Sequence, residues 1–208
     1  MHNKIAVSIL ILFLNCGFIV NICTAAQSPL SGKIIVIDPG HGGNDDGAIA
    51  NRVREAEVNL AVALKIRDKL LSTGTTVILT RSRDINLTLK DRVDIARGID
   101  ADIFVSIHVN SITNPGTAGA ISFYQSGRPN NLAVSIQETL VKESGAVDKG
   151  VRAENFYVMR ENYMTAVLIE IGFLTNVPES LRLTDDGYQN KVAEGISRGI
   201  INYLQSTL

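Results

Sequence analysis

The sequence contains very little cysteine. Its 208 residues include two cysteines, Cys16 and Cys23, and both lie in the first 26 residues. If that segment is removed during export, the mature chain has no thiol, which excludes a disulfide framework and thiol catalysis. Histidine is scarce as well, because only His41 and His108 lie outside the same segment. Any imidazole chemistry therefore depends on these two residues.

The chain also lacks an excess of charge of one sign. Its formal net charge is −1, and it has no block of lysine or arginine. A nucleic-acid partner needs a basic surface to neutralise phosphates, so we expect no nucleic-acid binding. With 45% apolar and 20% charged residues, the length suits one globular domain with a substantial core. We expect this domain to act as a monomer.

One long apolar run stands at the N-terminus. Residues 5–20 follow Lys4 and precede the small residues at positions 24–26. This layout is typical of a secretory signal peptide, which we assign to residues 1–26. The alternative is an uncleaved N-terminal anchor, because the apolar run approaches membrane-spanning length. In both cases the protein is exported, to the cell wall, the periplasm or the medium, and only the anchor would make a membrane its partner.

Beyond this run, short apolar or β-branched segments alternate with segments whose apolar residues recur at helical spacing. The expected strands are residues 33–37, 76–80, 103–107, 120–124 and 166–173. The expected helices are residues 55–72, 88–97, 131–144 and 188–204. This alternation predicts an α/β fold with a mainly parallel, mixed sheet of about six strands and helices on both faces. It forms a single domain over residues 33–208, after a linker at 27–32.

Two segments carry weaker patterns. Residues 120–124 alternate in polarity like a strand that lies at an edge of the sheet. Residues 145–153 are polar, and we expect them to form a mobile loop.

The two histidines occupy equivalent places in this predicted sheet. His41 follows the first strand through Pro39 and Gly40, and His108 directly follows the strand at 103–107. The ends of parallel strands open on the same edge of a sheet, where α/β proteins bind ligands. We therefore expect the two imidazoles to converge. The alternative is that each histidine is an ordinary loop residue.

Glu170 lies inside an apolar strand, at residues 167–171. Burying an unpaired carboxylate is costly, so such a residue needs a partner or a function. A structural pairing with Arg92 or Arg160 is one explanation. Otherwise Glu170 faces the same edge as the histidines, where it can act as a metal ligand or a general base.

Two imidazoles and a carboxylate, with one position left for water, describe a catalytic zinc site. A second carboxylate is then needed to handle the proton of that water. Glu55 and Glu57 at a helix start are candidates, and so are Asp45 and Asp46, for which turn formation is the alternative. Residue types alone leave open which glutamate binds metal and which is the base.

Several longer motifs extend this pattern from residue 33 to the C-terminus. They are IDPGHGG around His41, EAEVNLAVAL from Glu55, TRSRDINLTLKDR from Thr80, SIHVN around His108 and IEIGFLTN around Glu170. With these motifs the sequence resembles the zinc-dependent N-acetylmuramoyl-L-alanine amidases of bacterial cell walls, the amidase type 3 family. The resemblance implies that residues 33–208 are a zinc amidase catalytic domain.

The resemblance also implies roles for single residues. It makes His41, Glu55 and His108 the ligands of one zinc ion per chain, and Glu170 the catalytic carboxylate. The implied substrate is peptidoglycan, cut between N-acetylmuramic acid and the L-alanine of the stem peptide. Asn110, close to His108, either orients the substrate or stabilises its loop. The competing functions are another zinc hydrolase of the cell wall, a peptidase or deacetylase, and an inactive wall-binding regulator.

Overall fold

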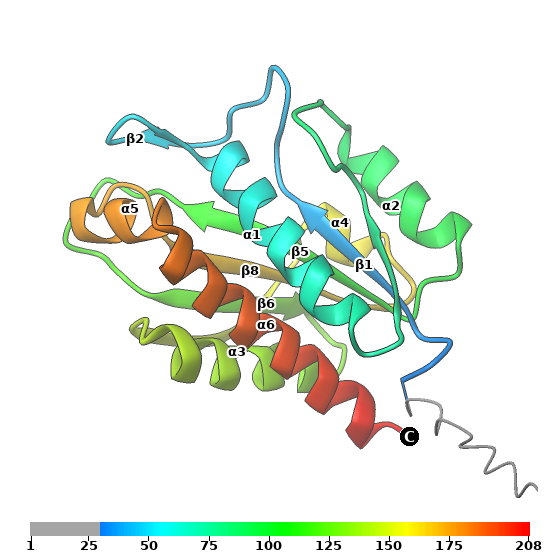
Figure 1. Cartoon of the computed structure of the whole chain (residues 1–208). Helices are drawn as coiled ribbons and strands as arrows, with labels where there is room; N and C mark the ends of the chain where they lie inside the picture. Colours follow the sequence, from blue (N-terminus) through cyan, green and yellow to red (C-terminus); the bar gives the residue numbers. More distant parts are fainter. Residues whose placement is uncertain (1–29) are drawn as a thin grey trace, which may run out of the picture.

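The strands of the chain form one six-stranded sheet in a computed structural model that describes residues 30–208 (Figure 1). In spatial order the strands are β4 (Thr76–Leu79), β1 (Ile34–Pro39), β5 (Ile103–Asn110), β8 (Thr165–Phe173), β6 (Ala120–Gln125) and β7 (Asp148–Glu154). The first four are parallel, and β6 joins β8 in the antiparallel direction. A separate hairpin pairs β2 (Ile49–Ala50) with β3 (Val53–Arg54). The predicted mixed, mainly parallel sheet is confirmed.

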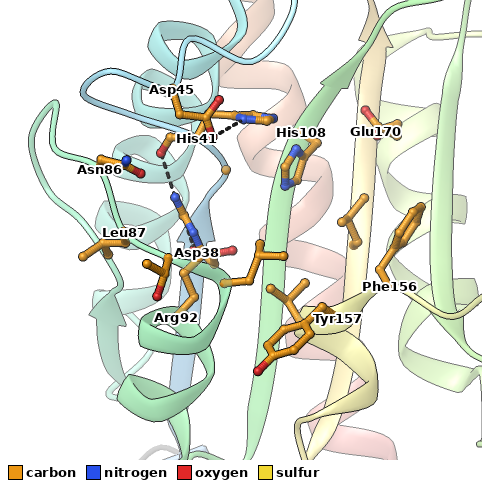
Figure 2. Close-up of a pocket in the computed structure, with 15 residues that line it drawn as sticks. Asp38, His41, Asp45, Asn86, Leu87, Arg92, His108, Phe156, Tyr157 and Glu170 are labelled. Atoms are coloured by element: carbon orange, nitrogen blue, oxygen red, sulfur yellow. Dashed lines mark hydrogen bonds and ion pairs between the residues drawn. The ribbon is translucent and has the colours of Figure 1, made fainter.

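Helices cover both faces of the sheet, but unequally. One face packs against three long helices, α1 (Glu55–Leu71), α3 (Asn131–Ser144) and α6 (Asp186–Ser206). The other face packs against α2 (Leu89–Gly98) and α4 (Tyr157–Arg160), which have ten and four residues. The helix α5 (Val177–Leu183) follows β8. Because α2 and α4 are short, a cavity stays open between them (Figure 2).

The alternation of side chains along the central strands decides which residues reach this cavity. On β5, Val105, Ile107 and Val109 belong to the core under the three long helices. His108 therefore projects to the face of α2 and α4. On β8, Glu170 projects to that face too, and it lies directly opposite His108 in the pairing of the two strands. The strand register thus places an imidazole and a carboxylate side by side.

Two expectations about the second half of the sheet are wrong. The strand at 120–124 is not at the edge, because β7 pairs with it on its outer side. The predicted mobile loop at 145–153 contains most of β7, from Asp148 onward. An edge strand needs only backbone hydrogen bonds on one side, so the polar side chains of β7 are compatible with pairing. The apolar pattern that reveals a buried strand is absent from it.

The described residues begin at Leu30, so the predicted signal peptide and most of the linker lie outside them. Leu30 itself is buried in the core under the long helices. Among residues 30–208, no helix has the length and apolar character needed to cross a membrane.

We expect Gly199→Ala to destabilise the fold. Gly199 lies on α6, and a Cβ atom there would stand 2.5 Å from the Cα atom of Ile136 on α3, so the two helices would have to separate. The overpacking should outweigh the gain in helix propensity and lower the free energy of unfolding by about 2 kcal/mol. Urea unfolding monitored by circular dichroism measures this change.

The matched control is Gly98→Ala on α2, where an added Cβ would meet nothing within 4 Å. This variant should be as stable as the parent or slightly more stable. An equal effect of the two substitutions would contradict the close packing of α3 and α6.

Candidate active site

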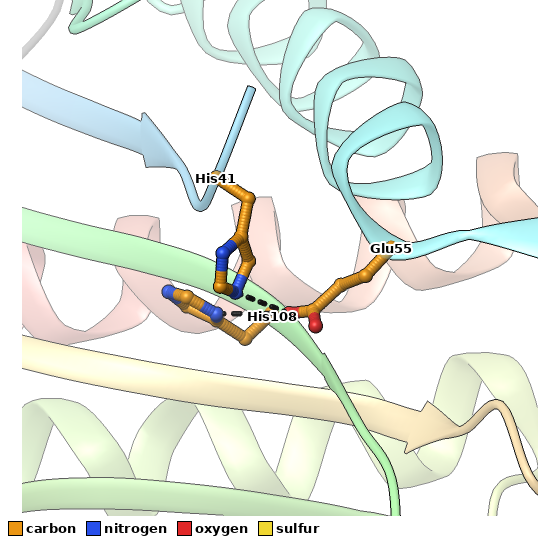
Figure 3. Close-up of side chains that lie close together, drawn as sticks. All are labelled: His41, Glu55 and His108. Atoms are coloured by element: carbon orange, nitrogen blue, oxygen red, sulfur yellow. Dashed lines mark hydrogen bonds and ion pairs between the residues drawn. The ribbon is translucent and has the colours of Figure 1, made fainter. Parts of the chain in front are cut away.

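His41, Glu55 and His108 come together at the carboxyl edge of the sheet, as Figure 3 shows. One ligand atom from each residue lies within 4.8 Å of the other two. Oε1 of Glu55 is 3.3 Å from Nε2 of His41 and 2.9 Å from Nδ1 of His108. The predicted convergence of the two imidazoles is confirmed, and their nitrogens face one carboxylate oxygen.

Glycines make this close approach possible. A Cβ atom on Gly40 would lie 2.3 Å from Cε1 of His108, and one on Gly47 would lie 2.6 Å from Cδ2 of His41. His41 itself has a φ of 61°, a left-handed conformation that L residues rarely adopt. The surrounding structure must therefore hold the His41 turn in place.

Arg81 provides part of that support through the backbone. It is almost fully buried, and its guanidinium donates hydrogen bonds to the carbonyl oxygens of Pro39 (2.9 Å), Gly40 (2.9 Å) and Ala56 (2.8 Å), and a longer one to that of Arg83 (3.3 Å). The guanidinium therefore ties the turn before His41 to the start of α1. Since α1 begins with Glu55, the same side chain fixes two of the three converging residues relative to each other.

Arg92 supports the turn from the side of α2. Its guanidinium donates to the carboxylate of Asp38 (2.7 Å) and to the carbonyl oxygens of Pro39 (2.8 Å) and His41 (2.9 Å). Arg92 is 2% exposed, so these bonds are shielded from water. Together, Arg81 and Arg92 form the arginine pair that holds the His41 turn.

Asp38 balances the charge of Arg92 at the end of β1. Its Oδ1 also accepts a hydrogen bond from the hydroxyl of Thr80 (2.6 Å), and its Oδ2 accepts one from the hydroxyl of Ser106 (2.7 Å). A buried ion pair is tolerated only when its hydrogen-bonding capacity is filled in this way. Thr80 directly follows β4, Arg92 is on α2 and Ser106 is on β5. Asp38 therefore links three elements under the site.

Glu55 is a buried carboxylate that stays ionised. Burial opposes its ionisation, but hydrogen bonds from His108 and His41 outweigh that effect and lower the pKa of Glu55. The backbone N–H groups of Ala48 (2.9 Å) and Val109 (3.1 Å) also donate to it. The carboxylate is thus fixed as an anion at the centre of the group.

Asp45 orients His41 from the outer side. Its Oδ2 lies 2.9 Å from Nδ1 of His41, and since a carboxylate only accepts hydrogen bonds, Nδ1 carries a proton in this contact. Nε2 is then the nitrogen that faces Glu55. The hydrogen bond to Glu55 raises the pKa of His41 to about 9 against the effect of burial, and Asp45 adds to the rise. Asp45 also accepts from the N–H of Gly47, so its turn role and its contact with His41 coexist.

The remaining acidic candidates lie away from the site. The side chain of Glu57 is 63% exposed and pairs with Arg54. Asp46 pairs with the same arginine. Of the two glutamates at the start of α1, the geometry therefore brings Glu55, and not Glu57, to the histidines.

Glu170 borders the cavity beside His108 and has no structural counter-ion. Its Oε2 is buried and has no hydrogen-bond partner within the described residues. The arginines proposed as its partners are engaged elsewhere, Arg92 with Asp38 and Arg160 with Glu161, so the structural explanation is wrong. Burial raises the pKa of Glu170 to about 7, with a smaller contribution from Glu55 and opposition from the histidines.

Asn110 lies outside the cavity lining. Its Oδ1 accepts a hydrogen bond from the N–H of Ser111 (2.8 Å), and its carbonyl oxygen accepts one from the N–H of Leu174 (2.8 Å). These contacts favour the loop-stabilising alternative over contact with a substrate.

The cavity itself has a volume of about 450 Å³ and continues from the histidines toward α2 and α4. Figure 2 shows Asn86, Leu87 and Arg92 on one side and Phe156 and Tyr157 on the other. None of these residues is recognisable as cavity lining from the sequence alone. They lie in or beside the first turns of α2 and α4, and for Leu87, Phe156 and Tyr157 the one local signal is apolar or aromatic character outside the predicted strands and helices.

Comparisons with known proteins match this arrangement. Residues 35–202 match the family model described as N-acetylmuramoyl-L-alanine amidase. The germination-specific N-acetylmuramoyl-L-alanine amidase of Bacillus subtilis is 38% identical over 84% of this chain and 81% of that protein. The amidase LytC of the same organism is 37% identical over 85% of this chain, which spans only 36% of LytC. The solved catalytic domain of CwlV, an amidase from Bacillus (Paenibacillus) polymyxa, aligns with a TM-score of 0.81 and 41% identity over 83% of this chain and 98% of that domain.

We expect Arg92→Lys to weaken the binding of a divalent metal ion at this group. A lysine keeps the charge opposite Asp38, but one ammonium cannot reproduce the planar fork that also reaches the carbonyls of Pro39 and His41. Loss of such an outer contact should raise the Kd for Zn²⁺ about tenfold, measured by competition with a chromogenic chelator. Arg198→Lys, at an exposed arginine on α6 that pairs with Glu194, is the control. Unchanged affinity in Arg92→Lys would mean that the turn holds without the guanidinium of Arg92.

Glu170→Gln should change how stability depends on pH in the metal-free protein. Because burial raises the pKa of Glu170 from 4.5 to about 7, the folded state binds the proton more tightly and loses stability as pH rises through that window. Relative to the parent, the glutamine variant should gain on the order of 3 kcal/mol between about pH 4 and about pH 8. Urea unfolding of the parent and the variant at about pH 4 and about pH 8, with a chelator present, measures this change. A shift of the same size in Glu57→Gln, at an exposed glutamate, would rule out burial as the cause.

Proposed function

The chain belongs to the N-acetylmuramoyl-L-alanine amidase family, and from this premise we propose that it hydrolyses the amide bond between N-acetylmuramic acid and the L-alanine of the peptidoglycan stem peptide. The observation that carries the proposal is the cluster of His41, Glu55 and His108, whose two histidines line a cavity. Glu170 also lines this cavity, and its Oε2 has no hydrogen-bond partner among the described residues. Metal ligands, a proton acceptor and space for a substrate are the parts that this hydrolysis requires.

We infer that His41, Glu55 and His108 hold one zinc ion. Two imidazole nitrogens and one carboxylate oxygen are a donor set that suits catalytic zinc, with a further position for water. The contact between His41 and Asp45 supports this assignment, because ligating histidines usually donate their other N–H to a carboxylate. Zinc supplies polarisation of a carbonyl oxygen and a bound water of lowered pKa.

Glu170 is the residue that moves the proton in this proposal. A general base works best when its pKa lies near the working pH, and burial brings the pKa of Glu170 to about 7. Its Oε2 has no partner among the described residues and is free to accept the proton of the attacking water. The same oxygen then gives the proton to the amine of L-alanine as the amide bond breaks.

The proposal also sets where the protein works. Peptidoglycan lies outside the cytoplasmic membrane, and the apolar N-terminal run predicts export through a signal peptide. We therefore place the protein in the cell wall, the periplasm or the medium, acting as a monomer.

Digestion of purified peptidoglycan tests this function. The zinc-loaded protein should release peptides with L-alanine at their amino terminus, detected by mass spectrometry after labelling of new amines. Glu170→Gln should lower kcat by about a thousandfold, because it loses the base, while still binding one zinc ion. Glu57→Gln, at the exposed glutamate of the same helix turn, should keep the parent's activity.

Other products would contradict the assignment. Release of acetate would identify a deacetylase, and new amino termini other than L-alanine would identify a peptidase. Full activity in the presence of a strong chelator would contradict the zinc site, and loss of zinc from Glu170→Gln would make Glu170 a ligand.

A further inference from the structure

The cavity beside the candidate metal group has two unlike ends. One end carries His41, His108 and Glu170, whereas the other lies between α2 and α4 (Figure 2). Apolar or aromatic side chains form that second end, namely Leu87, Leu89, Phe156, Tyr157 and Val158. Leu89 is 54% exposed and Phe156 is 39% exposed, so both present apolar surface to the open cavity. Concave apolar surface next to polar groups is typical of a ligand site.

The charges of the cavity restrict what this end can bind. Arg92 is the one arginine or lysine in the lining, and its guanidinium already forms hydrogen bonds with Asp38 and with two carbonyl oxygens. Besides Asp38, which pairs with Arg92, the other charged lining groups outside the metal ligands are the carboxylates of Asp45 and Glu170. An anionic ligand would meet these carboxylates with no free cation among the lining residues, all of which the structure describes. The cavity therefore suits a neutral ligand that has an apolar face.

The two halves of the proposed substrate differ in charge. On the acyl side of the scissile bond is an N-acetylated sugar, which is neutral and presents C–H faces and an acetyl methyl group. On the amine side is a peptide that ends in a carboxylate. We propose that the cavity between α2 and α4 is a sugar subsite, formed by Leu87, Leu89, Phe156, Tyr157 and Val158, that binds the acyl half of the substrate. This inference rests on the proposed function.

The polar groups of the cavity agree with this assignment. The phenol of Tyr157 lies among the apolar side chains, where it can hydrogen-bond to a sugar hydroxyl. Asn86 also lines the cavity, and because its amide nitrogen donates to Oδ1 of Asn44 (2.6 Å), its amide oxygen is the group that can accept from a sugar hydroxyl. The aromatic rings of Phe156 and Tyr157 offer flat apolar surface for the sugar ring. A subsite that combines apolar walls with a few neutral polar groups distinguishes a sugar from a charged peptide.

The opposite side of Glu170 carries the charge that the peptide half needs. Ile121 on β6 pairs with Glu170, and the neighbouring Ala120 pairs with Asp148 on β7. Lys149 therefore lies two strands from Glu170 at the same end of the sheet, roughly 10 Å away at the usual strand spacing. Its Nζ is 5.9 Å from the ring of Phe173, and it forms no ion pair within residues 30–208. A peptide leaving toward β7 would meet this free cation.

Two small substrates test the subsite. One is an N-acetylmuramyl peptide, and the other is the same peptide acylated with lactic acid alone, which keeps the scissile bond but lacks the sugar. The parent enzyme, loaded with zinc, should have a higher kcat/KM for the substrate with the sugar. Leu89→Ala should lower that kcat/KM about tenfold and affect kcat/KM for the lactyl substrate much less. The ratio of the two kcat/KM values should therefore fall.

The matched control is Leu181→Ala on α5, which removes a leucine that is 68% exposed and lies outside the cavity lining. The ratio of kcat/KM for the two substrates should be the same in this variant as in the parent. Circular dichroism and thermal unfolding of both variants check that the fold is intact, as expected for exposed positions. Lys149→Gln adds a second reading, because it should raise KM for a peptide with a free carboxylate more than for the corresponding amide.

The possible outcomes distinguish a failure of the sugar subsite from a failure of the proposed function. If the parent releases L-alanyl peptides from peptidoglycan but Leu89→Ala lowers kcat/KM equally for both substrates, or for neither, the sugar subsite is wrong and the function stands. If the parent hydrolyses neither peptidoglycan nor the small substrates, both are wrong. An equal effect of Lys149→Gln on the acid and the amide would overturn the direction assigned to the peptide.

Discussion

The buried ion pair between Asp38 and Arg92 is the constraint on which the geometry of the site depends. An unpaired charge in this position would be costly, so the two side chains have one favourable arrangement. In that arrangement the remaining N–H groups of Arg92 reach the carbonyl oxygens of Pro39 and His41. The left-handed turn at His41 is therefore stabilised by bonds that exist only when β1, α2 and the turn are all in place. A metal site on such a turn is organised before any ion binds.

The unequal helical layers of the fold explain why the chemistry lies on one face. Three long helices seal the face to which Val105, Ile107 and Val109 of β5 point. The helices α2 and α4 cover the opposite face incompletely, and His108 and Glu170 point into the space they leave. Glu170 on that face is thus buried enough to have a raised pKa and still borders the cavity in which a substrate can bind. The pKa of Glu170 is a direct consequence of this intermediate position.

Much of this arrangement could be predicted from the sequence because it follows from strand periodicity. The apolar runs located the central strands, and the rule that parallel strands end on one edge brought His41 and His108 together. The choice between Glu55 and Glu57 could not be made from residue types, since both stand in the first turn of α1 and only the helix orientation separates them. Arg81 was missed because its partners are backbone oxygens far away in sequence. Arg92 was considered as a partner of Glu170, because the sequence does not reveal that the carboxylate it pairs with is that of Asp38. The strand β7 was missed because an edge strand pairs through its backbone and carries no apolar pattern.

The apolar end of the cavity is formed mainly by short segments outside the central strands. Leu87 precedes α2 and Leu89 begins it, and Phe156 and Tyr157 stand at the start of α4. The converging histidines and Glu170 stand after β1, on β5 and on β8. Recognition and bond cleavage thus reside in different parts of the chain. Substitutions in these short segments can therefore change the substrate specificity toward a differently modified polymer, while the hydrolytic residues on the central strands stay the same.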